Sequence, residues 1–234
     1  MDREKIPVVY SERSMSLSIP RLILDLSAWW IFGIVLFLYL LVAGISQEFI
    51  YKNSLYYRSY SGTLTNDTIE GMLGFQSRFW WTGYAVTPII LLFKFLFTSI
   101  CISIGAMLQG IDIKFKDIFK TAMLAEGVFI VAQVIFMISL YVHLEDVTLQ
   151  NTSGYYPFSA LYFIGMENVN AQWAVYPLQT INLFEVLYVA VIAWLLSKKW
   201  RPDFIEGLNI VIPSYGLGLL LWMVLVAFLI LQVS

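Results

Sequence analysis

The sequence has few charged residues for its length. Of its 234 residues only 13% are Asp, Glu, Lys or Arg, and 59% are hydrophobic. A soluble domain usually carries about a quarter charged residues, because its surface has to face water. The composition therefore excludes an ordinary soluble domain and predicts an integral membrane protein.

Cysteine and histidine occur once each, as Cys101 and His143. A lone cysteine excludes an internal disulfide, and a lone histidine excludes a His-rich metal centre. The net charge of -2 argues against a nucleic-acid partner, which would require a basic patch. Phosphate-binding loops, dinucleotide fingerprints, hydrolase elbows and zinc-protease motifs are also missing from the sequence. We therefore expect no enzymatic activity, no cofactor and no metal.

Long apolar runs occupy most of the chain. A helix needs about 20 apolar residues to cross the hydrocarbon of a bilayer. Runs of that kind cover residues 22–45, 83–108, 121–142, 177–196 and 207–231. The first is longer than the roughly 7–15 apolar residues of a signal peptide, so we expect it to be retained. The sequence predicts an all-α integral membrane fold, a five-transmembrane-helix bundle forming one domain over residues 1–234.

Lysine and arginine are concentrated on one side of the predicted spans. They lie before the first run, between the second and third, and between the fourth and fifth: Arg3, Lys5, Arg13, Arg21, Lys114, Lys116, Lys120, Lys198, Lys199 and Arg201. The opposite side has only Lys52, Arg58 and Arg78. The positive-inside rule therefore predicts a multi-pass protein of the cell (inner or plasma) membrane, with its N-terminus cytoplasmic and its C-terminus outside.

Two outer loops, residues 46–82 and 143–176, are the only sizeable segments between the spans. The first ends in Phe79-Trp80-Trp81, which is typical of the aromatic belt at a membrane surface, and Asp67 to Glu70 resembles a helix start. In the second loop, residues 157–163 are apolar but too short to cross. We expect both loops to carry short helices that lie in the membrane interface.

Three ionisable residues lie inside predicted spans, namely Lys94, Glu126 and Glu185. A charge at the bilayer centre costs about 2.5–3.5 kcal/mol on insertion scales, so these side chains should face the bundle interior and pair. Lys94 and Glu185 differ in predicted depth by only about 5 Å, which a lysine side chain can bridge. Gln133 shares a helix face with Glu126, and Asn182 precedes Glu185 by one turn. The predicted intramembrane polar network is Lys94, Glu126, Gln133, Asn182 and Glu185.

Two interpretations of this network stay open. It can be structural, a buried ion pair with amide side chains that fixes which helices touch. It can instead be functional, because one Lys between two Glu leaves one carboxylate free to carry a proton or bind a cationic substrate. Many transporters are built from internal repeats, whereas this chain has only five predicted spans and no evident repeat. The structural interpretation is therefore favoured.

The last apolar run contains Pro213, Ser214 and Gly218. Proline leaves a backbone carbonyl without its helical partner, and we expect a kink there. Ser214 and Gly218 are four residues apart, a spacing of small residues that lets two helices approach closely. Packing within the chain is favoured over a dimer interface.

Several segments resemble the Yip family of Ypt/Rab-interacting membrane proteins, and more closely its bacterial relatives. They are Lys94-Phe95-Leu96-Phe97, the Gly-then-basic loop from Gly110 to Phe119, and Tyr176 to Tyr188, which is similar to the start of the family's fourth span. The resemblance covers residues 83–232. It implies five spans with a cytoplasmic N-terminus and the role of a membrane-embedded adaptor or scaffold.

The favoured function is therefore non-enzymatic, an accessory or scaffold subunit of a larger membrane assembly. Its expected partners are membrane lipids and other membrane or envelope proteins, because the aromatic outer loops are large enough to contact them. The alternative is a small transporter or permease subunit that uses Lys94, Glu126 and Glu185 within the bundle.

Overall fold

The computed structural model describes residues 26–51, 53–60, 62–142, 148–149, 152, 156–200 and 203–233. Over these residues the protein is all-helical, with one isolated β-bridge between Ser159 and Asn182 and no strand. Predictions that concern the N-terminal tail, the start of the first run, Lys52, His143 or Arg201 fall outside the described residues.

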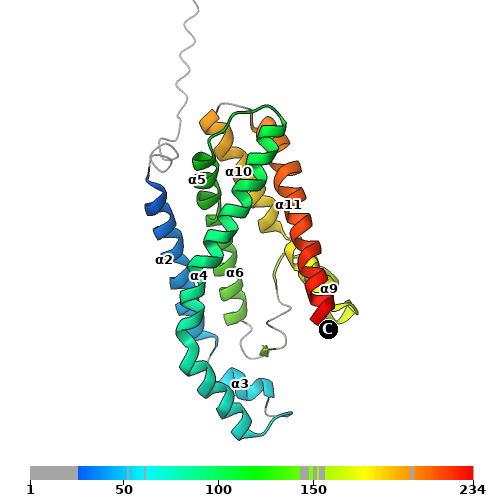
Figure 1. The fold of residues 1–234 in the computed structure, drawn as a ribbon. Coiled ribbons are helices and arrows are strands. Elements are labelled where there is room, and N and C mark those ends of the chain that lie inside the picture. Colours follow the sequence, from blue (N-terminus) through cyan, green and yellow to red (C-terminus); the bar gives the residue numbers. More distant parts are fainter. Residues whose placement is uncertain are drawn as a thin grey trace, which may run out of the picture.

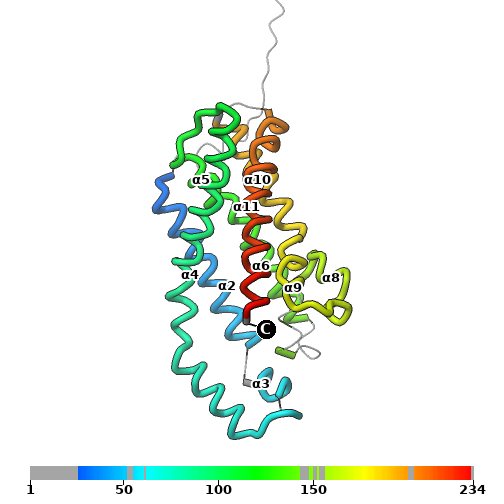
Figure 2. Tube along the Cα trace, turned by 45° about the vertical axis from the view of Figure 1, so that its right-hand side comes forward, coloured from blue at the N-terminus to red at the C-terminus, as the bar shows by residue number. Residues whose placement is uncertain are grey.

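Four helical stretches are long and apolar enough to cross a membrane. They are α2 (Ala28–Phe49), α4 (Asn66–Leu108), α5 (Phe115–Ala125) continued by α6 (Gly127–Val142), and α11 (Phe204–Val233). Figure 1 and Figure 2 show them running along one elongated bundle. The predicted all-helical class is confirmed for the described residues, and these helices are compatible with a multi-pass membrane protein.

The remaining long helix, α10 (Leu183–Trp200), follows α9 in the chain and joins the same bundle. It carries Glu185 in its first turn and Lys198 and Lys199 in its last, and it is not among the four stretches above. Tyr188 and Ile192 are fully buried, and α10 packs against α5, α6 and α11. One face of α10 is therefore buried in the bundle, and its charges are confined to its ends.

The predicted continuous helix over residues 177–196 is wrong, because the chain breaks at Ile181 and Asn182 between α9 (Gln172–Thr180) and α10. The Asn182 amide donates to the carbonyls of Gln179 and Thr180 at 3.0 Å each, which an uninterrupted helix would not allow. Its Oδ1 accepts the Glu185 N–H at 2.8 Å, the bond of an N-cap residue. Asn182 thus ends one helix and starts the next.

The segment before the break is fastened to the outer loop. That loop contains the short helix α8 (Ala160–Ile164), which Ser159 caps by accepting the N–H of Tyr162. The Ala160 N–H donates to the carbonyl of Ile181 at 2.8 Å, so the backbone freed by the break is hydrogen-bonded within the protein.

The second and third apolar runs also differ from their predicted bounds. The short helix expected near Asp67 and the span expected over 83–108 form the single 43-residue helix α4, which bends at Phe79 (φ -111°, ψ 16°). The third run begins earlier than predicted, at α5, and is interrupted at Glu126 between α5 and α6. The short helix α3 (Asn53–Tyr60) precedes α4, and α3 and the first part of α4 stand at the lower end of Figure 1.

Close contact between α4 and α11 fixes one side of the bundle. A Cβ built on Gly105 would lie 2.2 Å from Ser214 Cβ, and one on Gly218 would lie 2.4 Å from Cys101 Sγ. Only glycine permits such separations. Ser214 and Gly218 therefore contact α4 of the same chain.

Pro213 lies within α11, which runs as one helix from Phe204 to Val233. Proline has no N–H to donate to the carbonyl four residues earlier, that of Asn209. Gln109, just after α4, donates its side-chain Nε2–H to this carbonyl at 3.1 Å. The carbonyl that Pro213 leaves free thus accepts a hydrogen bond that links the end of α4 to α11.

Candidate functional site

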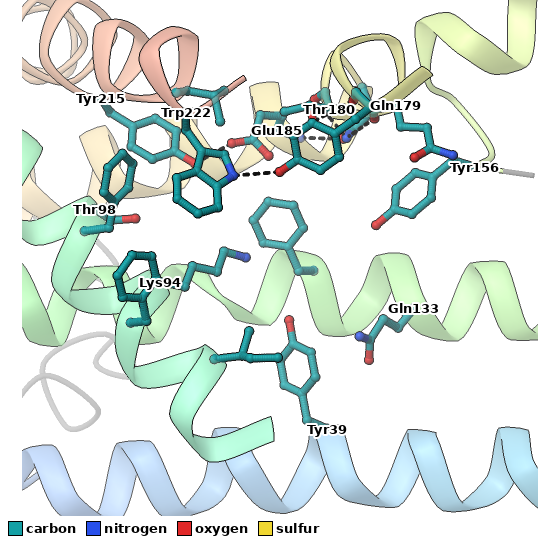
Figure 3. Close-up of a pocket in the computed structure, with 17 residues that line it drawn as sticks. Tyr39, Lys94, Thr98, Gln133, Tyr156, Gln179, Thr180, Glu185, Tyr215 and Trp222 are labelled. Carbon is teal, nitrogen blue, oxygen red and sulfur yellow. Dashed lines mark hydrogen bonds between the residues drawn. The ribbon is translucent and has the colours of Figure 1, made fainter. Parts of the chain in front are cut away.

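A cavity of about 400 Å³ opens between α4, α6, α9, α10 and α11. Four members of the predicted polar network line it, namely Lys94, Gln133, Asn182 and Glu185. Figure 3 shows these elements around the cavity, with Lys94, Gln133 and Glu185 projecting into it from three different helices. Residues far apart in the sequence therefore share one site.

Lys94 places its ammonium group at the floor of the cavity. Its Nζ donates to Glu126 Oε1 at 2.7 Å. The same nitrogen lies 3.5 Å from the centre of the Phe129 ring and 5.4 Å from that of Tyr188. A cation over an aromatic face is stabilised by the negative charge of the ring's π surface. Lys94 is thus neutralised by one carboxylate and held against two rings.

Glu126 is fully buried beneath the cavity rather than in its lining. It lies at the break between α5 and α6, where its Oε1 also accepts the Tyr39 hydroxyl at 2.5 Å. Its second oxygen, Oε2, is buried and has no hydrogen-bond partner among the described residues. The carboxylate is therefore anchored through one oxygen to α2 and α4 at once.

Glu185 lies on the opposite wall, in the first turn of α10. It accepts a hydrogen bond from the Tyr215 hydroxyl of α11. The expected ion pair of Lys94 with Glu185 is wrong, because the structure pairs Lys94 with Glu126. The depth estimate assumed a continuous fourth helix, whereas α10 begins only two residues before Glu185 and brings that carboxylate to the helix end.

The two amides of the predicted network have different surroundings. Gln133 lines the cavity two turns along α6 from Glu126. The side-chain polar atoms of Asn182 are engaged by the backbone at the helix break. Asn182 therefore positions Glu185, whereas Gln133 offers its amide to the cavity, as Figure 3 shows.

Aromatic side chains make up most of the remaining wall, and the sequence analysis did not single them out. They are Tyr39, Phe93, Phe97, Phe129, Tyr156, Tyr176, Tyr215 and Trp222. Trp222 Nε1 donates to the Tyr176 hydroxyl at 2.7 Å, which links α11 to α9 across the cavity. In a chain that is 17% aromatic, nothing in the sequence distinguishes these residues from those facing lipid.

The predicted packing residues of the last run lie elsewhere. Pro213, Ser214 and Gly218 do not line the cavity, and they lie at or beside the contact of α11 with α4. They hold together two of the helices that form its wall.

The chemistry available at the site follows from its charges. Lys94 and Glu126 form a neutral pair, whereas Glu185 faces the cavity with a hydroxyl partner and, among the described residues, no cation in an ion pair with it. Such a site can bind a ligand or exchange a proton at Glu185. Among the described residues no group of three His, Cys, Asp or Glu could hold a metal ion.

Comparisons with family models, curated proteins and solved structures found no match to this chain.

Proposed function

We propose that this protein is a five-span membrane protein that binds a small ligand in the cavity described above, as a small transporter or permease subunit. The observation that carries this proposal is the break between α9 and α10, which borders the cavity beside Glu185. Polar side chains of three other helices converge on the same space.

A broken helix has a specific physical meaning inside a membrane. Irregular backbone is tolerated there only where protein covers it or where it lines a water-filled cavity. Discontinuous helices of many transporters form substrate sites in this way near the middle of the bilayer. The cavity volume, about 400 Å³, also lies in the usual range of roughly 300–1,000 Å³ for small-molecule sites.

The placement in the membrane follows from charge. With α9 and α10 together as the fourth crossing, the basic residues at the end of α10 and the start of α5 lie at one face, which we assign to the cytoplasm. The outer loop that carries α8 and the first loop with α3 then lie outside. The cavity is bordered by α9 and is therefore nearer the outer face.

Water access to the cavity tests the proposal. In a Cys101→Ala background, Gln133→Cys places a thiol in the cavity, and Val131→Cys places one on the exposed side of the same helix. We expect a small, uncharged, water-soluble thiol reagent to label the Gln133→Cys protein in membrane vesicles. Val131→Cys should stay unlabelled, because a thiol facing lipid remains protonated and unreactive. Equal, slow labelling of both would show that the cavity is closed to solutes and would contradict a ligand site.

An accessory-subunit role is the second candidate, favoured by the outer extension. The first part of α4 and α3 reach past the ends of their neighbours in Figure 1, and Phe75, Trp80 and Trp81 are exposed there. The resemblance to the Yip-family adaptors agrees with such a role and remains a prediction from the sequence.

Gentle extraction tests this second role. A partner bound through the extension should copurify in stoichiometric amount with the wild-type protein and with Leu221→Ala, whose exposed side chain lies on α11. Copurification should fall with Phe75→Ala/Trp81→Ala. A partner retained by all variants, or no partner at all, would contradict an interface at this extension.

A further inference from the structure

We infer that the ligand of the cavity is a small organic cation, such as an ammonium compound, bound between the Glu185 carboxylate and the aromatic wall. This inference rests on the proposed ligand-binding function and names the class of the ligand.

The first argument is the balance of charge. Lys94 is in direct contact with Glu126, and Glu126 is completely buried, so the ion pair of Lys94 is with Glu126 and not with Glu185. Among the described residues, the second carboxylate, Glu185, accepts a side-chain hydrogen bond from the Tyr215 hydroxyl, forms no ion pair, and lines the open space. An uncompensated carboxylate inside a bundle is costly, and a monovalent cation beside it would neutralise it.

The second argument is the chemistry of the wall. Aromatic faces attract organic cations, and aromatic cages are the common recognition device for quaternary ammonium groups. Phe93, Phe97 and Trp222 lie together on one side, with ring centres 5.8 Å (Phe93) and 5.9 Å (Phe97) from that of Trp222. A bare Ca²⁺ or Mg²⁺ ion would instead need six or more oxygen ligands, which a mainly aromatic wall does not supply.

The protein itself already shows this mode of binding. The Lys94 ammonium lies 3.5 Å from the centre of the Phe129 ring, with a carboxylate oxygen at 2.7 Å. That arrangement is an ammonium ion held by one carboxylate and one aromatic face. Glu185 and Trp222 offer the same two components on the facing wall of the cavity, as Figure 3 shows.

An anionic ligand is disfavoured by the same contacts. Among the described residues that line the cavity, Lys94 is the only one with a cationic side chain, and Glu126 already neutralises it. An anion would have to displace Glu126 from Lys94 and leave that buried carboxylate uncompensated, while also approaching Glu185. Both steps cost free energy.

Calorimetry on the purified full-length protein in mild detergent tests the inference with three probes of similar shape, benzyltrimethylammonium, benzyl alcohol and phenylacetate. We expect saturable binding of the cation only. Glu185→Gln keeps a hydrogen-bond acceptor for Tyr215 and should weaken cation binding by about tenfold or more, because the charge is lost. Glu70→Gln removes the same charge from an exposed position outside the cavity and should leave binding unchanged.

Two further variants keep the outcome decisive if Glu185→Gln does not yield a monodisperse protein. Glu185→Asp retains the charge and should still bind the cation, whereas Phe97→Leu removes one aromatic face and should weaken binding. Saturable binding of phenylacetate or benzyl alcohol that Phe97→Leu weakens would overturn the cation assignment and leave the ligand site standing. If none of the three probes binds while Gln133→Cys is labelled by the thiol reagent, the cation assignment would also be overturned. An unlabelled Gln133→Cys would remove the proposed function itself.

Discussion

At the scale of single residues, Glu126 has the most demanding environment of the site. It is fully buried, it receives Lys94 and Tyr39 on the same oxygen, and its other oxygen lacks a partner among the described residues. A carboxylate in this position is tolerable only while Lys94 compensates its charge. The pair therefore acts as a unit, and its two members cannot be replaced independently.

Replacement of Lys94 alone should accordingly be costly. We expect Lys94→Met to lower the free energy of unfolding by roughly 3 kcal/mol, because it leaves a buried carboxylate without a counter-charge. The double variant Lys94→Met/Glu126→Gln removes both charges and should recover most of the loss. Denaturation by SDS in mixed micelles measures both changes. Equal destabilisation by the single and the double variant would contradict the coupling.

The sequence predicted which charged residues would face the interior of the bundle but not which would pair. The cost of an intramembrane charge is enough to assign Lys94, Glu126 and Glu185 to the interior. Their pairing depends on helix ends and on rotation of the helices, and counting residues along apolar runs supplies neither. Tyr215 and Tyr39, which hold the two carboxylates, carry no sequence signal because tyrosine is common throughout the chain.

At the scale of helices, the α4–α11 contact determines the shape of the cavity wall. Small residues at Gly105 and Gly218 let the two helices approach, and Gln109 adds a hydrogen bond next to the Pro213 turn. Beyond this contact, Trp222 lies against Phe93 and Phe97 at the cavity. A substitution at the close contact of α4 with α11 should therefore also alter the wall of the cavity.

Gly105→Ala should destabilise the protein by about 1–3 kcal/mol, since its new Cβ would overlap Ser214 and force the helices apart. Gly33→Ala is the matched control, because nothing lies within 4 Å of a Cβ at that position of α2. Gly33→Ala should be neutral or stabilising by up to about 1 kcal/mol through helix propensity. Unfolding of both variants under the same conditions measures the difference, and equal effects would contradict the tight contact.

The hydrogen bond from Gln109 to the Asn209 carbonyl can be tested together with Pro213, because Pro213 leaves this carbonyl without its helical donor. Gln109→Leu should cost on the order of 1 kcal/mol, because the Asn209 carbonyl loses its donor. In a Pro213→Ala background, the alanine N–H supplies the helical bond, so the same Gln109→Leu change should cost clearly less. A double-mutant cycle measures this coupling. Strictly additive effects would show that the two residues do not share this carbonyl.

Helix type was easier to predict than helix continuity. Apolar composition identified α11 to within three residues at each end, but it placed the first span about one turn too early, and it carried the prediction across Asn182, where the helix breaks. Asn followed three residues later by Glu is an N-terminal capping pattern, and it marks the start of α10 within an otherwise apolar run. This capping pattern was present in the sequence, but the long apolar run around it favoured the prediction of one continuous helix.

At the scale of the whole molecule, the two ends of the bundle carry different kinds of residue. One end has Lys199 paired with Asp117 between α10 and α5, together with the exposed basic residues of α5. The other end has α3, the first turns of α4 and the aromatic residues near Phe79. Because positive charge favours the cytoplasmic side, this asymmetry supports the proposed orientation, with the α5 end of the bundle inside.

The side of the membrane on which the C-terminus lies reports the number of crossings. Among the described residues, the predicted span over α9 and α10 is the one whose crossing is not indicated by length and composition. With five crossings and a cytoplasmic N-terminus, Gln232 at the end of α11 lies outside; with four, it lies inside. In a Cys101→Ala background we expect an impermeant maleimide on intact cells to label Gln232→Cys and Tyr57→Cys in α3. Lys116→Cys in α5 should be labelled only after permeabilisation. If Gln232→Cys follows Lys116→Cys while Tyr57→Cys is labelled from outside, the α9–α10 segment does not cross, and the broken helix re-enters from one face. If Lys116→Cys alone is labelled on intact cells, the orientation is reversed.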